Sequence, residues 1–286
     1  MANLKTHALA SALVLAASAA SAADVPMVEQ PPPPPVAAPD FGGWYLRGDI
    51  GFSNQHVDKI ENVLDAGASN LNTRQKSFDA APFGGVGVGY RFNEWLRADI
   101  TGEYRGNAGF NGYQTFNFVD GLGNDRVGVD RYTASKSEWT GMLNAYVDLG
   151  TWYGITPFIG AGIGASYNTI SNFQDNGMND LVGGGDQINS SAYAKDSSKW
   201  NLAWALQAGL AYEVTPGLTM ELAYRYINLG DARSGDIISY DGTNTINNPE
   251  KFKNLTSHDI KLGLRWALGE PIPAAEPEYP TLTRKY

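Results

Sequence analysis

Residues 44–52 read Trp-Tyr-Leu-Arg-Gly-Asp-Ile-Gly-Phe and place large apolar side chains at positions 44, 46, 50 and 52, with Arg47 and Asp49 between them. Successive side chains of a β-strand point to opposite faces, so this spacing predicts a strand with one apolar and one charged face. Residues 260–268 repeat the pattern, with Lys261 and Arg265 between the apolar positions. The chain therefore begins and ends its folded part with strands whose two faces differ in character.

Similar alternation predicts eight strands in all, at 43–53, 83–92, 95–105, 138–149, 156–167, 199–213, 217–228 and 257–268. The connections alternate between short and long, and the four long ones are rich in Asn, Asp, Gly and Ser, which favour solvent-exposed loops that bury no core. An even strand number with short turns at one end and long loops at the other is typical of outer-membrane barrels. We therefore predict an all-β fold, an eight-stranded antiparallel transmembrane β-barrel with short periplasmic turns, four long extracellular loops and both termini in the periplasm.

The charged residues of these stretches share one face, and seven are basic and seven acidic. Their aliphatic neighbours share the other face, which argues against a soluble barrel of the lipocalin kind, because such a barrel turns its apolar side inward. We expect the charges to fill a narrow lumen, pair through charge-assisted hydrogen bonds and block a wide pore. This charge ladder consists of Arg47, Asp49, Arg91, Arg97, Asp99, Glu103, Arg105, Asp148, Glu213, Glu221, Arg225, Asp259, Lys261 and Arg265.

Aromatic residues on the apolar face collect at both ends of the strands, as expected at the two interfaces of a bilayer. We predict one girdle at the loop side and one at the turn side. The loop-side girdle comprises Phe52, Tyr104, Trp139, Tyr167, Trp200 and Tyr226, and the turn-side girdle comprises Trp44, Tyr90, Tyr212 and Trp266.

The ends of the 286-residue chain have a different composition. A basic start, an apolar run and Ala20-Ser21-Ala22 predict a signal peptide over residues 1–22. Residues 23–40 are proline-rich and favour an extended periplasmic linker, and residues 269–286 form a similar tail, leaving 41–268 as the barrel. The net charge of −9 and the lack of a basic patch argue against nucleic acid as a partner.

Three motifs resemble the strands of small OmpA-like barrels: the proline-led strand at 156–164, Glu221–Gly230 and Ser257–Trp266. In this order they are similar to the alphaproteobacterial outer-membrane β-barrel family, the porin-family surface antigens. The resemblance covers about 41–268 and implies localisation in the cell outer membrane, in contact with lipid and lipopolysaccharide. One departure is that eighteen residues follow Leu268, whereas many such barrels end on an aromatic residue.

Nothing in the sequence predicts an enzyme, a cofactor or a metal site. Gly85–Gly89 lies at period two within a strand, so these glycines would make room for long lumenal side chains rather than bind a nucleotide. His56 and His258 have no suitable catalytic partner, because Ser257 lies on the opposite face from its neighbour. The acidic segments 175–180 and 183–186 match no complete calcium loop.

From the sequence we predict that this protein supports the cell envelope structurally. Some members of the family that the chain resembles are joined to peptidoglycan through an Ala-Asp N-terminus, which implies attachment through Ala23 and Asp24. Mass spectrometry of lysozyme-digested cell walls tests this, and finding only the unmodified N-terminus would exclude it. Two alternatives stay open: a small passive porin, and an adhesin that binds host or other extracellular ligands through its long loops.

Overall fold

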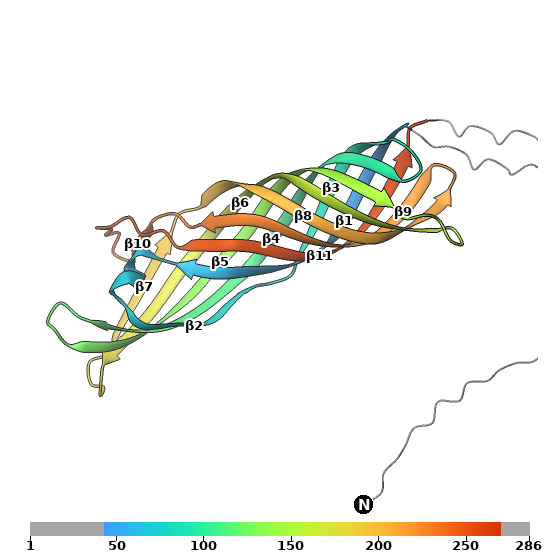
Figure 1. Cartoon of the computed structure of the whole chain (residues 1–286). Helices are drawn as coiled ribbons and strands as arrows, with labels where there is room; N and C mark the ends of the chain where they lie inside the picture. The colour runs from blue at the N-terminus through green and yellow to red at the C-terminus, as the bar shows by residue number, and fades with distance from the viewer. Residues whose placement is uncertain (1–42, 270–286) are drawn as a thin grey trace, which may run out of the picture. The chain divides into compact units, whose positions relative to one another are not determined.

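The computed structural model describes residues 43–269. The predicted signal peptide, linker, tail and peptidoglycan attachment residues lie outside this range. The described part contains one short 3-10 turn, η1 (Val63–Gly67), and eleven strands (Figure 1). The strands are β1 (Gly43–Glu61), β2 (Ser69–Phe78), β3 (Ala81–Arg91), β4 (Leu96–Val119), β5 (Asp125–Asp148), β6 (Ile155–Leu181), β7 (Ile188–Ala194), β8 (Ser197–Thr215), β9 (Leu218–Arg233), β10 (Ile237–Ser239) and β11 (Lys251–Ala267).

Every strand pairing is antiparallel, and eight strands pair in an unbroken cycle. The order is β1–β3–β4–β5–β6–β8–β9–β11, and β11 returns to β1, where Tyr45 lies opposite Ala267. Such closure removes the two free edges that an open eight-stranded sheet would have. The three remaining strands lie outside the cycle, β2 against β4, β7 against β6, and β10 against β7. The prediction of an all-β antiparallel fold is confirmed.

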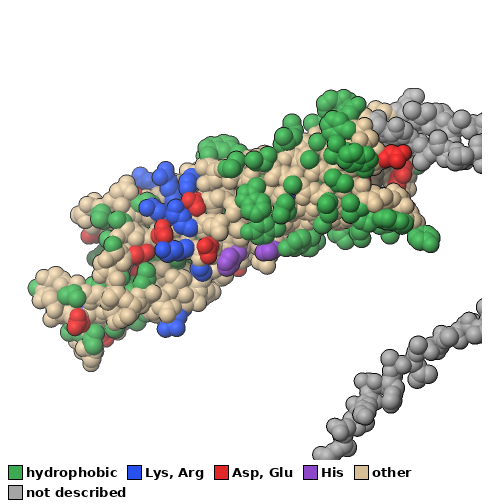
Figure 2. All heavy atoms as spheres, in the orientation of Figure 1, with side chains coloured by type: hydrophobic (Ala, Val, Ile, Leu, Met, Phe, Trp, Pro, Cys, Tyr) green, Lys and Arg blue, Asp and Glu red, His purple; other side chains and the backbone are tan. Residues whose placement is uncertain are grey.

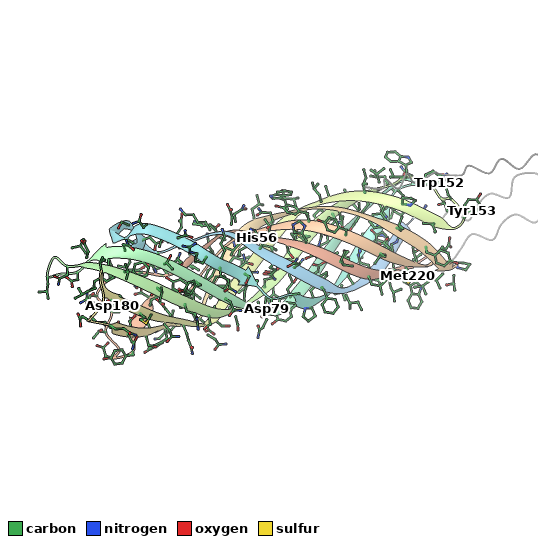
Figure 3. All side chains as sticks on the ribbon, turned by 90° about the horizontal axis from the view of Figure 1, so that it is seen from below. His56, Asp79, Trp152, Tyr153, Asp180 and Met220 are labelled. Carbon is green, nitrogen blue, oxygen red and sulfur yellow. The ribbon has the colours of Figure 1, made fainter. Side chains whose placement is uncertain are left out.

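The two ends of the cycle differ in their connections. Short turns join β3 to β4, β5 to β6 and β8 to β9, and Trp152 and Tyr153 mark this end in Figure 3. Leu268 donates its backbone N–H to the carbonyl oxygen of Trp44 at 2.8 Å, so the start of β1 and the end of β11 lie there together. Asp180 marks the opposite end, where β2, η1, β7 and β10 are added.

The prediction of four long loops that bury no core is wrong. The strands continue far into the segments predicted as loops, and β4 and β5 pair as far as Val119 and Asp125, which leaves only residues 120–124 as a connection. We call these continued strands, together with β2, η1, β7 and β10, the extension.

Bulges explain why the alternating pattern stops where the extension begins. The ladder shifts register between Arg105 and Ala108 in β4, and the positive φ angles of Asn172, Gly230 and Asn254 mark similar irregularities in β6, β9 and β11. An extra residue exchanges the two faces of a strand, so a strict period of two ends at each bulge although the strand continues.

The extension contains most of the apolar core, which continues into the cycle at Met142 and Ala205. The ring centroids of Phe78 and Phe110 lie 4.9 Å apart, and the ring of Phe252 lies 4.9 Å from that of Phe110. All three side chains are buried, with Val57, Ile60 and others around them. This end of the molecule is therefore a packed unit with a defined shape.

Apolar side chains cover the outside of the cycle between the short turns and the extension (Figure 2). Ile50, Val86 and Leu202 are each more than 60% exposed. Residues of both predicted girdles are exposed as well, including Phe52 at the extension side and Trp266 at the turn side. This outer surface suits contact with lipid, because a water-facing sheet would hide such residues.

Among residues 43–269, no helix has the length and apolar character needed to cross a membrane.

Candidate functional site

The interior of the cycle holds most of the predicted charge ladder. Eleven of its fourteen members are buried: Arg47, Asp49, Arg97, Asp99, Glu103, Arg105, Asp148, Glu221, Arg225, Asp259 and Lys261. Arg265 is slightly exposed at its side chain and pairs with Glu221 at 3.3 Å. The inward alternation of the strands brings these residues together from β1, β4, β5, β9 and β11.

Two predicted members do not join the ladder. Glu213 is exposed at the end of β8, where the ladder with β9 becomes irregular. Arg91, at the end of β3, donates to the backbone carbonyl oxygens of Asn93 and Glu94 in the adjacent turn. By the alternation of side chains along their strands, both residues should point inward. Because they lie at strand ends, the alternation alone gave the wrong prediction for them.

Arg47 organises the layer nearest the short turns. Its guanidinium contacts Asp49 at 2.8 Å and Asp99 at 2.6 Å, and it reaches Glu221 at 3.3 Å. It also donates to the hydroxyl oxygen of Tyr146 at 2.8 Å. The same layer contains Arg97, which pairs with Asp148 and Glu221, each at 3.2 Å.

Arg105 and Arg225 form a second layer nearer the extension. Both contact Asp259, at 2.8 and 2.9 Å. Arg225 also donates two hydrogen bonds to Glu103, at 2.8 and 2.6 Å, in the bidentate geometry that makes such pairs strong. All four side chains are almost completely inaccessible to solvent.

Two further charges belong to this layer and were not predicted. Glu138 pairs with Arg105 at 2.8 Å and with Lys136, which also donates to Gln55 at 2.9 Å. Glu138 lies an even number of residues from Asp148 in β5, so their side chains share the inward face. The alternation could therefore have identified Glu138. Lys136 lies in a segment predicted as loop, and its inward direction became clear only with the full length of β5.

The lumenal glycines make room for these long side chains, as predicted. A Cβ atom on Gly85 would lie 2.5 Å from Cγ of Glu103, and one on Gly89 would lie 2.3 Å from the ring of Tyr45. Either distance is far below a normal carbon–carbon contact. The glycines of β3 therefore allow the charged layers to fill the interior across its full width.

A second candidate site lies in the extension, where a cavity of about 430 Å³ opens. Its wall includes η1, whose N-cap residue Asn62 accepts a hydrogen bond from the N–H of Leu64. Asp65, Asp130 and Asp175 line it, and no Lys or Arg side chain does. The sequence did not predict this cavity, because its residues come from six separate segments that meet only when the extension folds.

Buried carboxyl groups give this cavity unusual acid–base properties. Burial, with Asp130 close by, raises the pKa of Asp175 to about 8. Burial also raises the pKa of the neighbouring Glu250 to about 8, although its hydrogen bond from Asn62 acts in the opposite direction. At neutral pH both groups are therefore largely protonated.

The stability of the extension should fall as the pH rises from about 5 to about 8. The folded state holds protons on Asp175 and Glu250 that the unfolded chain releases near pH 4, so the folded state binds more protons throughout this interval. We expect the melting temperature of the extension to drop by at least about 4 °C over the interval. Differential scanning calorimetry measures it.

The double variant Asp175→Asn/Glu250→Gln should lose most of that pH dependence. Asp241→Asn serves as a matched control, because Asp241 is an exposed carboxylate whose hydrogen bonds from Thr243 lower its pKa. An equal pH dependence in the wild type and in the double variant would show that other groups cause it.

The remaining candidate groups, Ser257 and His258, lie on opposite faces of β11. Ser257 points inward and donates to Asp259 at 2.6 Å, whereas His258 lies outside with its Nδ1 atom 2.5 Å from the hydroxyl of Tyr224. Within residues 43–269, no three His, Cys, Asp or Glu side chains are grouped so that they could hold a metal ion.

Comparison with known proteins identifies the family to which these features belong. Residues 9–267 match the family described as outer membrane protein beta-barrel domain. The chain belongs to this family. This family assignment agrees with the closed antiparallel cycle and its apolar outer surface. Membership of the family places the chain in the outer membrane.

Relatives of this outer-membrane barrel occur in Brucella and Rickettsia. An uncharacterised protein of Brucella suis biovar 1 is 33% identical over 280 residues, which cover 89% of this chain and 94% of the relative. A Rickettsia bellii protein named "Putative adhesin" is 29% identical over 224 residues, covering 78% and 87%. The resemblance inferred from the sequence is thus confirmed.

Among solved structures, the outer membrane protein OprG of Pseudomonas aeruginosa is 15% identical, covers 80% of this chain and 98% of its own, and gives a TM-score of 0.40. Neisserial surface protein A is also 15% identical, covers 79% and 97%, and gives a TM-score of 0.39.

Proposed function

We propose that this outer-membrane protein is a sealed, eight-stranded barrel that supports the envelope and does not act as a passive pore. The observation that carries the proposal is the pair of charged layers around Arg47 and Arg105, which fills the lumen with buried, mutually paired side chains. The apolar core of the extension lies beyond them and adds a second obstacle. Water and solutes would have to displace both, at a high free-energy cost.

The proposed orientation places the short turns and both chain ends in the periplasm and the extension outside the cell. Short periplasmic turns and longer outer segments are the rule in this architecture. The exposed apolar surface with its aromatic residues would then cross the bilayer. Attachment to peptidoglycan through Ala23 and Asp24 stays a prediction, since those residues lie outside the described range.

Planar-bilayer recording of the refolded full chain tests the sealed barrel. We expect no steady openings of porin size, because a lumen filled by paired side chains would leave no continuous water path. A porin of known conductance, refolded and recorded in the same way, shows that insertion and recording work. Steady openings of comparable size in this protein would overturn the proposal and favour the passive porin.

A second candidate function is binding of an extracellular partner by the extension. The observation in its favour is the cavity lined by Asp65, Asp130 and Asp175 in a unit that packs around an apolar core. Rickettsia relatives named as putative adhesins support the same function. Cells that display the wild-type chain should retain more host cells than cells that display Asp130→Asn/Asp175→Asn, and equal retention would count against the cavity as the binding site.

A further inference from the structure

Basic side chains, with acidic ones among them, gather on the outer surface just beyond the apolar surface (Figure 2). Five basic residues come together here through the strand register and a shared ion-pair partner, and we call them the basic patch: Lys59 of β1, Lys199 of β8, Arg233 of β9, and Lys251 and Lys253 of β11. The side chain of Lys59 is 68% exposed, and those of Lys199 and Lys253 are more than one-third exposed. None of these residues takes part in the lumenal network.

The register of the strands places like charges directly opposite one another. Lys59 faces Lys253 across the β1–β11 pair, and Lys251 faces Arg233 across the β11–β9 pair. Directly opposed like charges destabilise a sheet. This arrangement therefore costs stability in the isolated protein and would be relieved by an anion bound over the strands.

The acidic neighbours compensate part of this charge. Glu61 pairs with Lys59 at 2.8 Å and lies opposite Lys251 in the β1–β11 register. A single carboxylate, Asp231, is shared by Lys199 at 2.9 Å and Lys253 at 3.0 Å. The five basic side chains therefore share the carboxylates of Glu61 and Asp231 in their ion pairs, and Arg233 and Lys251 form no ion pair within residues 43–269.

The height of the patch above the apolar surface indicates what kind of anion it can meet. Phe52 and Ile260 lie opposite each other at the upper part of that surface, and Lys59 and Lys253 lie opposite each other seven residues further on. Seven residues span about 23 Å along a strand, or about 18 Å along the membrane normal at a tilt of about 40°. The headgroup region of a phospholipid bilayer is only about 7 Å deep on each side.

We propose that the basic patch binds the phosphorylated saccharide headgroup of an anionic glycolipid in the outer leaflet. This inference rests on the proposed orientation, with the extension outside the cell. A multi-sugar headgroup extends far enough from the bilayer to bring phosphate groups to the level of Lys59 and Lys253, which a phospholipid headgroup does not. The strand register holds these cations close together, so one headgroup can contact several of them.

Native mass spectrometry of the full chain in detergent tests this proposal with three probes. They are lipopolysaccharide with a phosphorylated inner core, the same lipopolysaccharide after removal of its phosphates, and phosphatidylglycerol. We expect the phosphorylated lipopolysaccharide to bind most tightly, and Lys59→Gln/Lys253→Gln to lower its affinity at least about tenfold. The control Arg74→Gln/Arg131→Gln removes the same charge from exposed positions on β2 and β5 and should change the affinity less than about twofold.

Several outcomes would overturn the proposal. Equal losses in the patch variant and in the control variant would mean that general charge, rather than this surface, attracts the lipid. Equal binding of the dephosphorylated lipopolysaccharide would exclude recognition of phosphate, and equal binding of phosphatidylglycerol would exclude the need for an extended headgroup. Displacement of the lipopolysaccharide by millimolar inorganic phosphate would show a site for the free anion instead.

Two controls separate a failure of this proposal from a failure of the proposed function. Heat-modifiable migration on a gel shows that Lys59→Gln/Lys253→Gln still folds as a barrel. An epitope tag inserted in the turn of residues 120–124 shows whether the extension is accessible on intact cells. An inaccessible tag would contradict the orientation on which the inference rests, whereas an accessible tag without lipopolysaccharide binding would contradict the inference alone.

Discussion

The variant Arg225→Met should lose about 3–5 kcal/mol of unfolding free energy, because it leaves buried carboxylates without their partner. Arg225 donates two hydrogen bonds to Glu103 and one to Asp259, and all three side chains are inaccessible to solvent. Among residues 43–269, Arg105 would remain as the only arginine paired with these carboxylates, at 2.8 Å from Asp259 but 3.6 Å from Glu103. Urea unfolding of the protein in lipid vesicles, followed by tryptophan fluorescence, measures the loss.

The double variant Arg225→Met/Glu103→Gln separates the missing charge from the missing packing. Neutralising Glu103 removes the uncompensated carboxylate, so this variant should regain a substantial part of the loss. Arg74→Gln, at an exposed position on β2, should change the unfolding free energy by less than about 0.5 kcal/mol. A loss below about 1 kcal/mol for Arg225→Met would show that the charged layer contributes little to stability.

Phe252→Ala should destabilise the extension by about 3–5 kcal/mol, the usual cost of emptying a buried phenylalanine site. Phe252 is completely buried, and its ring contacts those of Phe78 and Phe110. We expect proteases to cut within the extension, whereas the membrane-spanning part keeps its heat-modifiable migration. Limited proteolysis of the protein in vesicles, followed by mass spectrometry of the fragments, measures both effects.

Leu122→Ala is the matched control, since Leu122 is 88% exposed in the turn between β4 and β5. It should leave the proteolysis pattern unchanged. Loss of heat-modifiable migration together with the extension in Phe252→Ala would contradict the view that the core of the extension folds as a separate cooperative unit.

The membrane-spanning half of the fold was predictable because one rule governs it throughout. Alternation by itself assigns Arg47, Asp99 and Arg225 to the interior and Ile50 to the outside, where their side chains indeed lie. The rule fails at strand ends, as Arg91 and Glu213 show, because alternation does not reveal where the lumen opens to solvent.

The extension could not be predicted from the same rule. Each bulge, such as the one at Asn172, exchanges the two faces of a strand, so the pattern beyond it resembles irregular loop. The cavity depends on segments far apart in the sequence, including Asp65 and Asp175, and their proximity depends on pairings that alternation does not specify. The basic patch was hidden for the same reason, because Lys59 and Lys253 become neighbours only through the register of β1 and β11.

In the proposed orientation, with the extension outside the cell, its paired strands have a consequence for immune recognition of a cell that carries this protein. An antibody that reaches this surface meets residues from several hairpins held side by side, for example residues 111–117 of β4 next to residues 69–78 of β2. Its epitope would be discontinuous and would disappear when the protein is denatured. Synthetic peptides copied from single hairpins would then be poor vaccine antigens, and the refolded barrel would be the appropriate immunogen.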